Sequence, residues 1–153
     1  NRLVDKFRHV TFTRDWHPSD HCSFGFPPEF RDGSWPIHCV QDTPGAEFHG
    51  DLRVPLDAIF INKGDAPDAE AYSAFEGTRL AEELRRRGVT RVYVAGLTLD
   101  YCVRSTALDA VRLGFSAAVV RDAVRAVNPD RTDALFAELE AAGVSLPSTD
   151  DLL

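Results

Sequence analysis

The sequence has few cysteines, little positive charge and no long apolar run, and each shortage excludes a class of protein. Three cysteines in 153 residues, without a CxxC pair, do not make a disulfide framework, so we expect a protein of the reducing cytoplasm. No apolar run is long enough to span a membrane, and no signal-peptide pattern is present. The 17 Lys and Arg residues against 24 Asp and Glu give a net charge of −7, which argues against a nucleic-acid or anionic-membrane partner.

The rest of the composition is typical of one globular domain over residues 1–153. Hydrophobic residues make up 44% and charged residues 27% of the chain, and this length is enough to bury a core. Strand-like runs alternate with helical patterns. The strands are expected at residues 9–13, 57–62, 91–95 and 116–120, and the helices end at Gly88, Gly114 and Gly143. This alternation predicts an α/β fold of three α/β/α layers around a mostly parallel central sheet.

The stretch around Cys102 carries the clearest chemical signal. Residues 91–95 form a β-rich run, Gly96 interrupts it, and Asp100 stands where a helix N-cap would stand. Cys102 then falls in the first turn of a helix, where free backbone N–H groups and the helix dipole favour a thiolate. The alternative is that Cys102 is a buried apolar side chain, which is the common fate of a free cysteine.

Reactive side chains follow three of the expected strands. Asp15 and His17 follow the first strand, Lys63 follows the second, and Cys102 follows the third. Because ligands bind beyond the carboxyl ends of parallel strands, we expect these side chains to meet at one edge of the sheet. If Lys63 faces Cys102, its charge stabilises a thiolate; the alternative is a lysine that merely ends a strand.

The segment of residues 18–50 is long and irregular, and it contains two further histidines, His21 and His38. One carboxylate and two imidazoles would leave open positions on a divalent metal ion, as in catalytic sites. The alternative is a set of loop histidines that only satisfy local hydrogen bonds. Cys22 and Cys39 match no zinc-finger spacing and are interpreted as packing residues.

Taken together, these motifs resemble the nicotinamidase branch of the isochorismatase-like cysteine hydrolases. The resemblance runs from residue 9 to beyond residue 120. It rests on an ordered series: Asp15-Trp-His17, Trp35-Pro-x-His38-Cys-Val, Thr43-Pro-Gly-Ala-x-Phe48, Lys63-Gly64, Tyr72-Ser-x-Phe75 and Asp100-Tyr-Cys102-Val-x-x-Thr106-Ala107. The resemblance implies a divalent metal, zinc before iron or manganese, held by Asp15, His17 and His38. His21 falls at a position where some members of the family have an additional metal ligand, so it is a further candidate ligand.

The resemblance also implies a reaction and a role for each matching residue. Cys102 would attack the carboxamide carbon of nicotinamide to form a thioester, releasing ammonia and then nicotinic acid for NAD salvage; pyrazinamide would be a further substrate. Lys63 would stabilise charge, and the backbone N–H groups of Thr98 and Cys102 would form the oxyanion hole, with Leu97–Thr98 at the family's cis peptide. Trp35 and Tyr72 would enclose a pyridine ring whose nitrogen binds the metal.

One element of the family pattern is missing. The family's general-base aspartate follows an N-terminal strand, which is expected upstream of Asn1, so the domain is expected to be N-terminally incomplete. Two alternatives therefore stay open: a related amidohydrolase acting on N-carbamoyl or ureido substrates, and a non-catalytic metal-binding protein. The motifs Asp15-Trp-His17 and Trp35 to Cys39 favour nicotinamidase over these alternatives. The expected partner is then a small pyridine carboxamide substrate, and the protein could also form a homo-oligomer.

Overall fold

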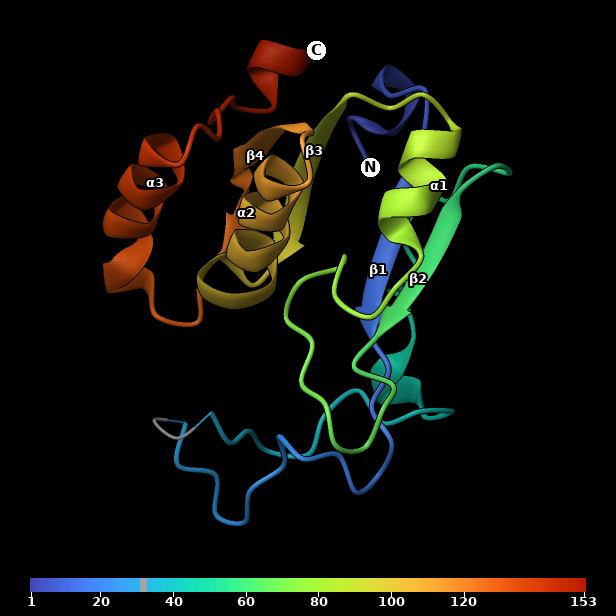
Figure 1. The fold of residues 1–153 in the computed structure, drawn as a ribbon, viewed down its shortest axis with the longest axis vertical. Coiled ribbons are helices and arrows are strands. Elements are labelled where there is room, and N and C mark those ends of the chain that lie inside the picture. The colour runs from blue at the N-terminus through green and yellow to red at the C-terminus, as the bar shows by residue number, and fades with distance from the viewer. Residues whose placement is uncertain (31–32) are drawn as a thin grey trace.

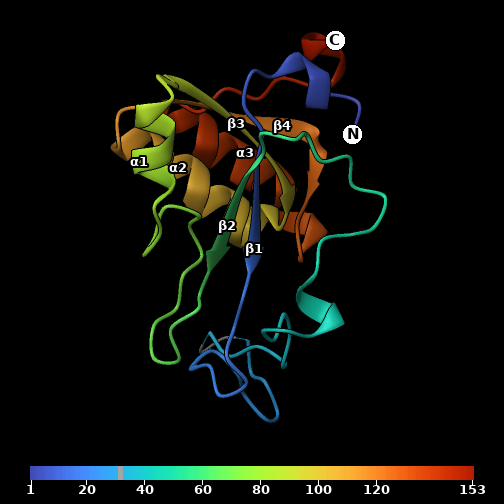
Figure 2. The same ribbon diagram turned by 90° about the vertical axis from the view of Figure 1, so that its right-hand side faces the viewer.

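The computed structural model describes residues 1–30 and 33–153, and its frame is two pairs of parallel strands (Figure 1). β1 (Thr11–Asp15) pairs with β2 (Ile59–Lys63), with Asp15 opposite Lys63. β3 (Arg91–Leu97) pairs with β4 (Ser116–Arg125), with an irregularity near Gly96. The predicted α/β fold with parallel strands is therefore confirmed, and both pairs are visible from the side in Figure 2.

β1 and β2 form one two-stranded sheet, and β3 and β4 form another. No strand among the described residues bridges β1 and β3, so the expected central sheet is present as two halves. Leu97, at the carboxyl end of β3, is 70% exposed, as fits a strand that is paired on one side only.

Each half takes its strand pattern from its apolar residues. In β2 the side chains of Ile59 and Ile61 are buried while Phe60 between them is largely exposed, so the strand has one inner face. In β4 four consecutive residues from Ala117 to Val120 are buried, as expected for a strand covered on both faces.

In the part of the chain that the structure describes, three α-helices flank the strands: α1 (Leu80–Arg86), α2 (Arg104–Arg112) and α3 (Thr132–Ala141). α2 packs on β3 and β4, and α3 packs on α2 (Figure 1). The helix ends agree with the predicted glycines, since Gly88, Gly114 and Gly143 all have positive φ just after a helix. None of the helices in the described part of the chain is long and apolar enough to cross a membrane.

The turn before α2 differs from its prediction. Residues Leu99–Val103 form a π-helical turn, in which the Val103 N–H donates to the Thr98 carbonyl at 3.0 Å, and α2 starts only at Arg104. The prediction of Asp100 as N-cap was wrong, because Thr98 occupies that position. The buried Asp100 carboxylate instead accepts hydrogen bonds from the backbone N–H groups of Val127 and Asn128.

The irregular segment returns to the carboxyl end of β1, below the strands in Figure 1. His17 and Val40 form an isolated parallel bridge, in which the His17 N–H donates to the Cys39 carbonyl at 3.0 Å. A second bridge joins Phe24 to Trp35. These contacts bring His38 next to the end of β1, although more than twenty residues separate them in sequence.

Candidate active site

The residues predicted from the sequence line one cavity of about 210 Å³ beyond the carboxyl ends of β1, β2 and β3. A larger hollow of about 560 Å³ lies beside Phe48 and Phe60 and contains none of the predicted site residues. The walls of the smaller cavity come from all three strand ends and from the irregular segment. The residues that line it are Asp15, His17, Trp35, His38, Lys63, Glu70, Tyr72, Leu97, Thr98, Tyr101, Cys102 and Val127.

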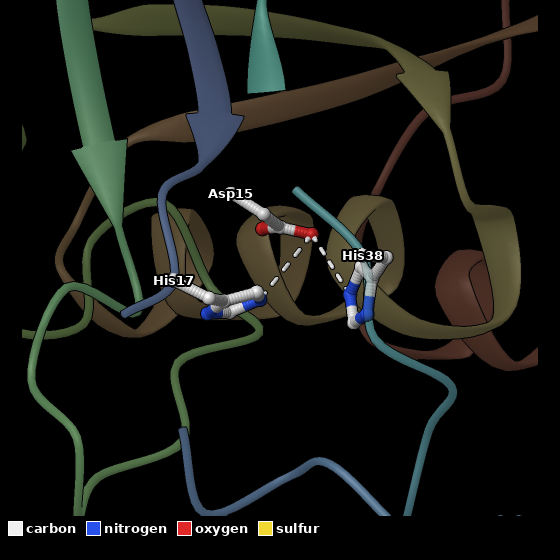
Figure 3. A group of neighbouring side chains, drawn as sticks. All are labelled: Asp15, His17 and His38. Atoms are coloured by element: carbon white, nitrogen blue, oxygen red, sulfur yellow. Dashed lines mark ion pairs between the residues drawn. The ribbon is translucent and has the colours of Figure 1, made fainter. Parts of the chain in front are cut away.

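Asp15, His17 and His38 converge on one point at this edge (Figure 3). Each offers one ligand atom, and these three atoms lie within 4.8 Å of one another. The Asp15 Oδ2 atom is 4.0 Å from His17 Nε2 and 3.9 Å from His38 Nε2. This spacing leaves room for an ion between the three groups. One carboxylate oxygen and two imidazole nitrogens are a donor set that suits zinc and other divalent transition metals.

Backbone carbonyls fix which nitrogen of each ring can bind a metal. His17 Nδ1 donates to the Gly64 carbonyl and His38 Nδ1 donates to the Pro36 carbonyl, both at 2.8 Å. Each Nε2 atom therefore keeps a lone pair on the side of Asp15, which is the usual arrangement of metal-binding histidines. Burial lowers the pKa of His17, against the opposing effects of the Gly64 carbonyl and Asp15, and so favours the neutral ring that a ligand requires.

His21 is held outside this group. Its Nδ1 atom is 2.7 Å from Ser23 Oγ, its Nε2 atom is 3.2 Å from the Ala69 carbonyl, and its ring lies 4.1 Å from the His17 ring. Both nitrogens thus have partners within the protein. In this structure His21 packs against a potential ligand instead of joining the ligand group, so its role as an additional ligand stays a prediction.

Lys63 links the metal-binding group to the cysteine. Its buried Nζ atom contacts the Asp15 carboxylate, donates to the Ala71 carbonyl at 2.8 Å and lies 3.4 Å from Cys102 Sγ. Burial opposes the charge, but the neighbouring Cys102 and Asp15 outweigh it and raise the pKa of Lys63. The alternative of a lysine that only ends a strand does not fit these three contacts.

The thiol of Cys102 is subject to two opposing effects. Burial raises its pKa, while the charge of Lys63 and a backbone hydrogen bond from Thr98 act to lower it, and burial wins. The sequence therefore predicted that Lys63 lowers the pKa of Cys102, but not that the pKa is raised overall. The thiol form of Cys102 is therefore favoured over the thiolate.

Thr98 directly follows β3, and Cys102 lies in the turn that comes next. The Leu97–Thr98 peptide bond is cis, at the position that the resemblance implies. Both residues line the cavity, and the Thr98 backbone is directed at the Cys102 sulfur. The oxyanion hole expected from their N–H groups is compatible with this geometry.

Three aromatic side chains form one wall of the cavity. Trp35 Nε1 donates to Tyr72 Oη at 3.0 Å, and the ring of Tyr101 lies 4.7 Å from Trp35 and 5.5 Å from Tyr72. Trp35 and Tyr72 were predicted to lie here, whereas Tyr101 was missed. In the sequence, the position of Tyr101 directly before Cys102 was the one indication that it lies near the site. Whether its side chain projects into the cavity depends on the π-helical turn.

Comparison with known proteins now adds to this geometry. The sequence model of the protein family described as "Isochorismatase domain" matches residues 1–151 of this chain. The chain belongs to the isochorismatase family. A nicotinamidase/pyrazinamidase of Mycobacterium tuberculosis is 43% identical over 148 residues, which cover 92% of this chain and 76% of the relative. With such relatives, this member of the isochorismatase family is a hydrolase.

Two solved structures of the family are similar to this chain. The Pyrococcus horikoshii pyrazinamidase in complex with zinc has a TM-score of 0.86 at 46% identity, over 96% of this chain and 79% of the other. The protein PnC1 from L. infantum, in complex with nicotinate, has a TM-score of 0.85 at 40% identity, over 94% of this chain and 73% of the other. The parallel-stranded fold is thus shared along nearly the whole chain.

Proposed function

We propose that the protein hydrolyses nicotinamide to nicotinic acid and ammonia, and that it also accepts pyrazinamide. The observation that carries this proposal is that a single cavity holds both a Cys102–Lys63 pair, 3.4 Å apart, and the Asp15, His17 and His38 group. The names of the relatives support the same substrate class, since they include a nicotinamidase/pyrazinamidase and a structure with bound nicotinate.

Asp15, His17 and His38 would hold one divalent ion, for which we propose zinc before iron or manganese. The zinc complex of the Pyrococcus horikoshii relative supports this choice. When bound, the ion supplies a Lewis-acid contact for the pyridine nitrogen. Trp35 and Tyr72 would enclose the ring, because their side chains meet at the wall of the same cavity. The carboxamide would then project toward Cys102.

In the proposed reaction Cys102 Sγ forms a bond to the carboxamide carbon, and the carbonyl oxygen gains the negative charge. The Lys63 ammonium and the backbone N–H groups of Thr98 and Cys102 stabilise that charge. Collapse of this intermediate releases ammonia and leaves a thioester, which water hydrolyses. Among the described residues no carboxylate is hydrogen-bonded to Cys102, whose side-chain partner is Lys63. The resemblance implies an aspartate that takes the proton from the thiol and passes it to the nitrogen that leaves as ammonia.

The same residues weigh against the two alternatives. An amidohydrolase for ureido substrates would use Cys102 and Lys63 but has no need of a metal-binding group beside them. A non-catalytic metal-binding protein has no need of a buried lysine at 3.4 Å from a cysteine. With Cys22, Cys39 and Cys102 all free, we further propose a reducing cytoplasmic location.

The test is a comparison of nicotinamide with benzamide, which lacks the ring nitrogen, in zinc-loaded and metal-free protein. Ammonia and nicotinic acid release, together with nicotinate binding by calorimetry, are measured. We expect turnover of nicotinamide that Cys102→Ala abolishes, and nicotinate binding that weakens on metal removal. A Cys102→Ala protein with the parent rate, or equal binding of nicotinate with and without metal, would contradict the proposal.

A further inference from the structure

Gly64 directly follows β2 and Lys63, and its backbone is in a conformation that favours glycine. Its φ is +61°, in the left-handed region that L side chains rarely adopt. The residue is buried, and its carbonyl accepts the hydrogen bond from His17 Nδ1 at 2.8 Å. The residue just after β2 thus fixes the tautomer of a histidine that lies two residues beyond the end of the neighbouring strand β1.

The missing side chain of Gly64 is as important as its carbonyl. A Cβ atom at this position would lie 2.6 Å from His17 Cε1 and 2.8 Å from His17 Nδ1, closer than real Cβ atoms come to other groups. Those two atoms form one edge of the ring, next to the metal-facing Nε2, which would lie 3.8 Å from the added atom. A side chain here would therefore displace the ring and break its hydrogen bond to the carbonyl.

The His17 ring has little space to retreat without disturbing the site. It is only 2% exposed, the His21 ring lies 4.1 Å away, and the Phe24 ring lies 5.7 Å away at a steep angle. On the side of Nε2 the Asp15 Oδ2 atom is 4.0 Å away, and the His38 ring lies 4.9 Å from the His17 ring. Displacement in that direction would close the gap that a metal ion requires.

We propose that Gly64 is a positioning residue of the metal site: its carbonyl sets the His17 tautomer, and its lack of a side chain sets the distance between His17 and Asp15. This inference rests on the metal site proposed above and adds a residue that touches neither metal nor substrate. Gly77 provides the matched control, because its φ is +66° but no atom lies within 4 Å of where its Cβ would be.

The experiment measures zinc affinity by competition with a fluorescent chelator for the wild-type chain, Gly64→Ala and Gly77→Ala. Both substitutions impose similar backbone strain, but only the first meets His17. We expect zinc affinity to fall by roughly tenfold to a hundredfold in Gly64→Ala, as for loss of other partners of metal-binding histidines, and to stay within about twofold in Gly77→Ala. Gly64→Asn adds the same Cβ but tolerates positive φ, so it should lose affinity like Gly64→Ala while folding more readily.

A double-mutant cycle with His17→Ala, measured as melting temperature in metal-free protein, tests the contact itself. If the Cβ acts through the imidazole, Gly64→Ala should lower the melting temperature less in the His17→Ala background than in the wild type. Equal losses in both backgrounds, or zinc affinity unchanged in Gly64→Asn, would overturn the inference while leaving the metal site standing. A wild-type chain that binds no zinc would instead overturn the proposed metal site and this inference with it.

Discussion

The β1–β2 pair and the β3–β4 pair have similar strands but different surroundings. In the β3–β4 half, Val119 and Val120 are almost fully buried, and the core side chains Leu135 and Leu139 of α3 are at most 1% exposed. In β1 no residue is fully buried. The half with the dense core carries Cys102, the proposed nucleophile, whereas the half with the sparser core carries Lys63 and the candidate metal ligands Asp15 and His17. Packing therefore holds Cys102 in place, and polar contacts hold its partners.

The strongest test of this difference between the halves is to remove the proposed nucleophile from one half and a proposed metal ligand from the other. Cys102→Ala should lower nicotinamide turnover by roughly a thousandfold or more, as removal of a nucleophile does in other hydrolases, and leave zinc bound. His17→Ala should lose zinc because it removes one of three ligands, and leave Cys102 open to alkylation. Turnover, elemental analysis and mass-spectrometric mapping measure these outcomes. If zinc leaves with Cys102→Ala, the two halves do not act separately.

The difference in packing predicts a difference in stability. Leu139 is fully buried, so Leu139→Ala should lower the free energy of unfolding by about 2–5 kcal/mol through lost contacts and a cavity. Phe60 of β2 is 44% exposed, so Phe60→Ala should lower it by less, although the side chain removed is larger. Urea denaturation followed by circular dichroism compares the two. A larger loss for Phe60→Ala would mean that β2 is covered in solution.

The pH dependence of Cys102 tests how one half acts on the other. Burial raises the pKa of this thiol, so its reactive thiolate forms at higher pH than in an ordinary cysteine. Alkylation should therefore be slow at neutral pH and rise on the alkaline side. Lys63 opposes the effect of burial, so Lys63→Met should move the alkylation profile to still higher pH. A profile that shifts to lower pH in Lys63→Met would mean that the lysine does not stabilise the thiolate.

Sequence reasoning succeeded where chain geometry leaves little freedom. Parallel strands end at the same edge of a sheet, so the positions of Asp15, Lys63 and Cys102 just after three strands were enough to predict that they meet. His17 follows the same strand as Asp15, two residues further on, and residues at this spacing in an extended chain project to one side. The α/β class followed from the alternation of strand and helix patterns in the same way.

The failures share a different physical origin. Hydrophobic periodicity does not distinguish an α-helical from a π-helical turn, so the side on which Tyr101 projects was not predictable. Asp100 fits an N-cap by residue type, but its carboxylate binds the backbone of residues 127–128, which no local pattern predicts. The close approach of Gly64 to His17 also joins residues almost fifty positions apart, and only the folded structure brings them together.

The aromatic wall is where the two halves meet, and it offers the smallest and most selective test. Tyr72 follows β2 and accepts the hydrogen bond from Trp35, while Tyr101 belongs to the turn after β3. Tyr72→Phe keeps the ring but removes that bond, which typically contributes about 0.5–1.5 kcal/mol, so nicotinate affinity should fall by roughly tenfold at most. Turnover at saturating nicotinamide should stay near the wild-type value, because the Cys102–Lys63 pair is untouched.

Tyr93→Phe is the matched control for this prediction, since Tyr93 packs against Phe7 and does not line the cavity. Calorimetric titration with nicotinate and steady-state kinetics distinguish loss of binding from loss of chemistry. If Tyr72→Phe lowers turnover at saturation but not affinity, the wall acts on the nucleophile rather than on the ring. In that case the aromatic residues belong functionally to the β3–β4 half, and the division of labour between the two strand pairs must be drawn differently.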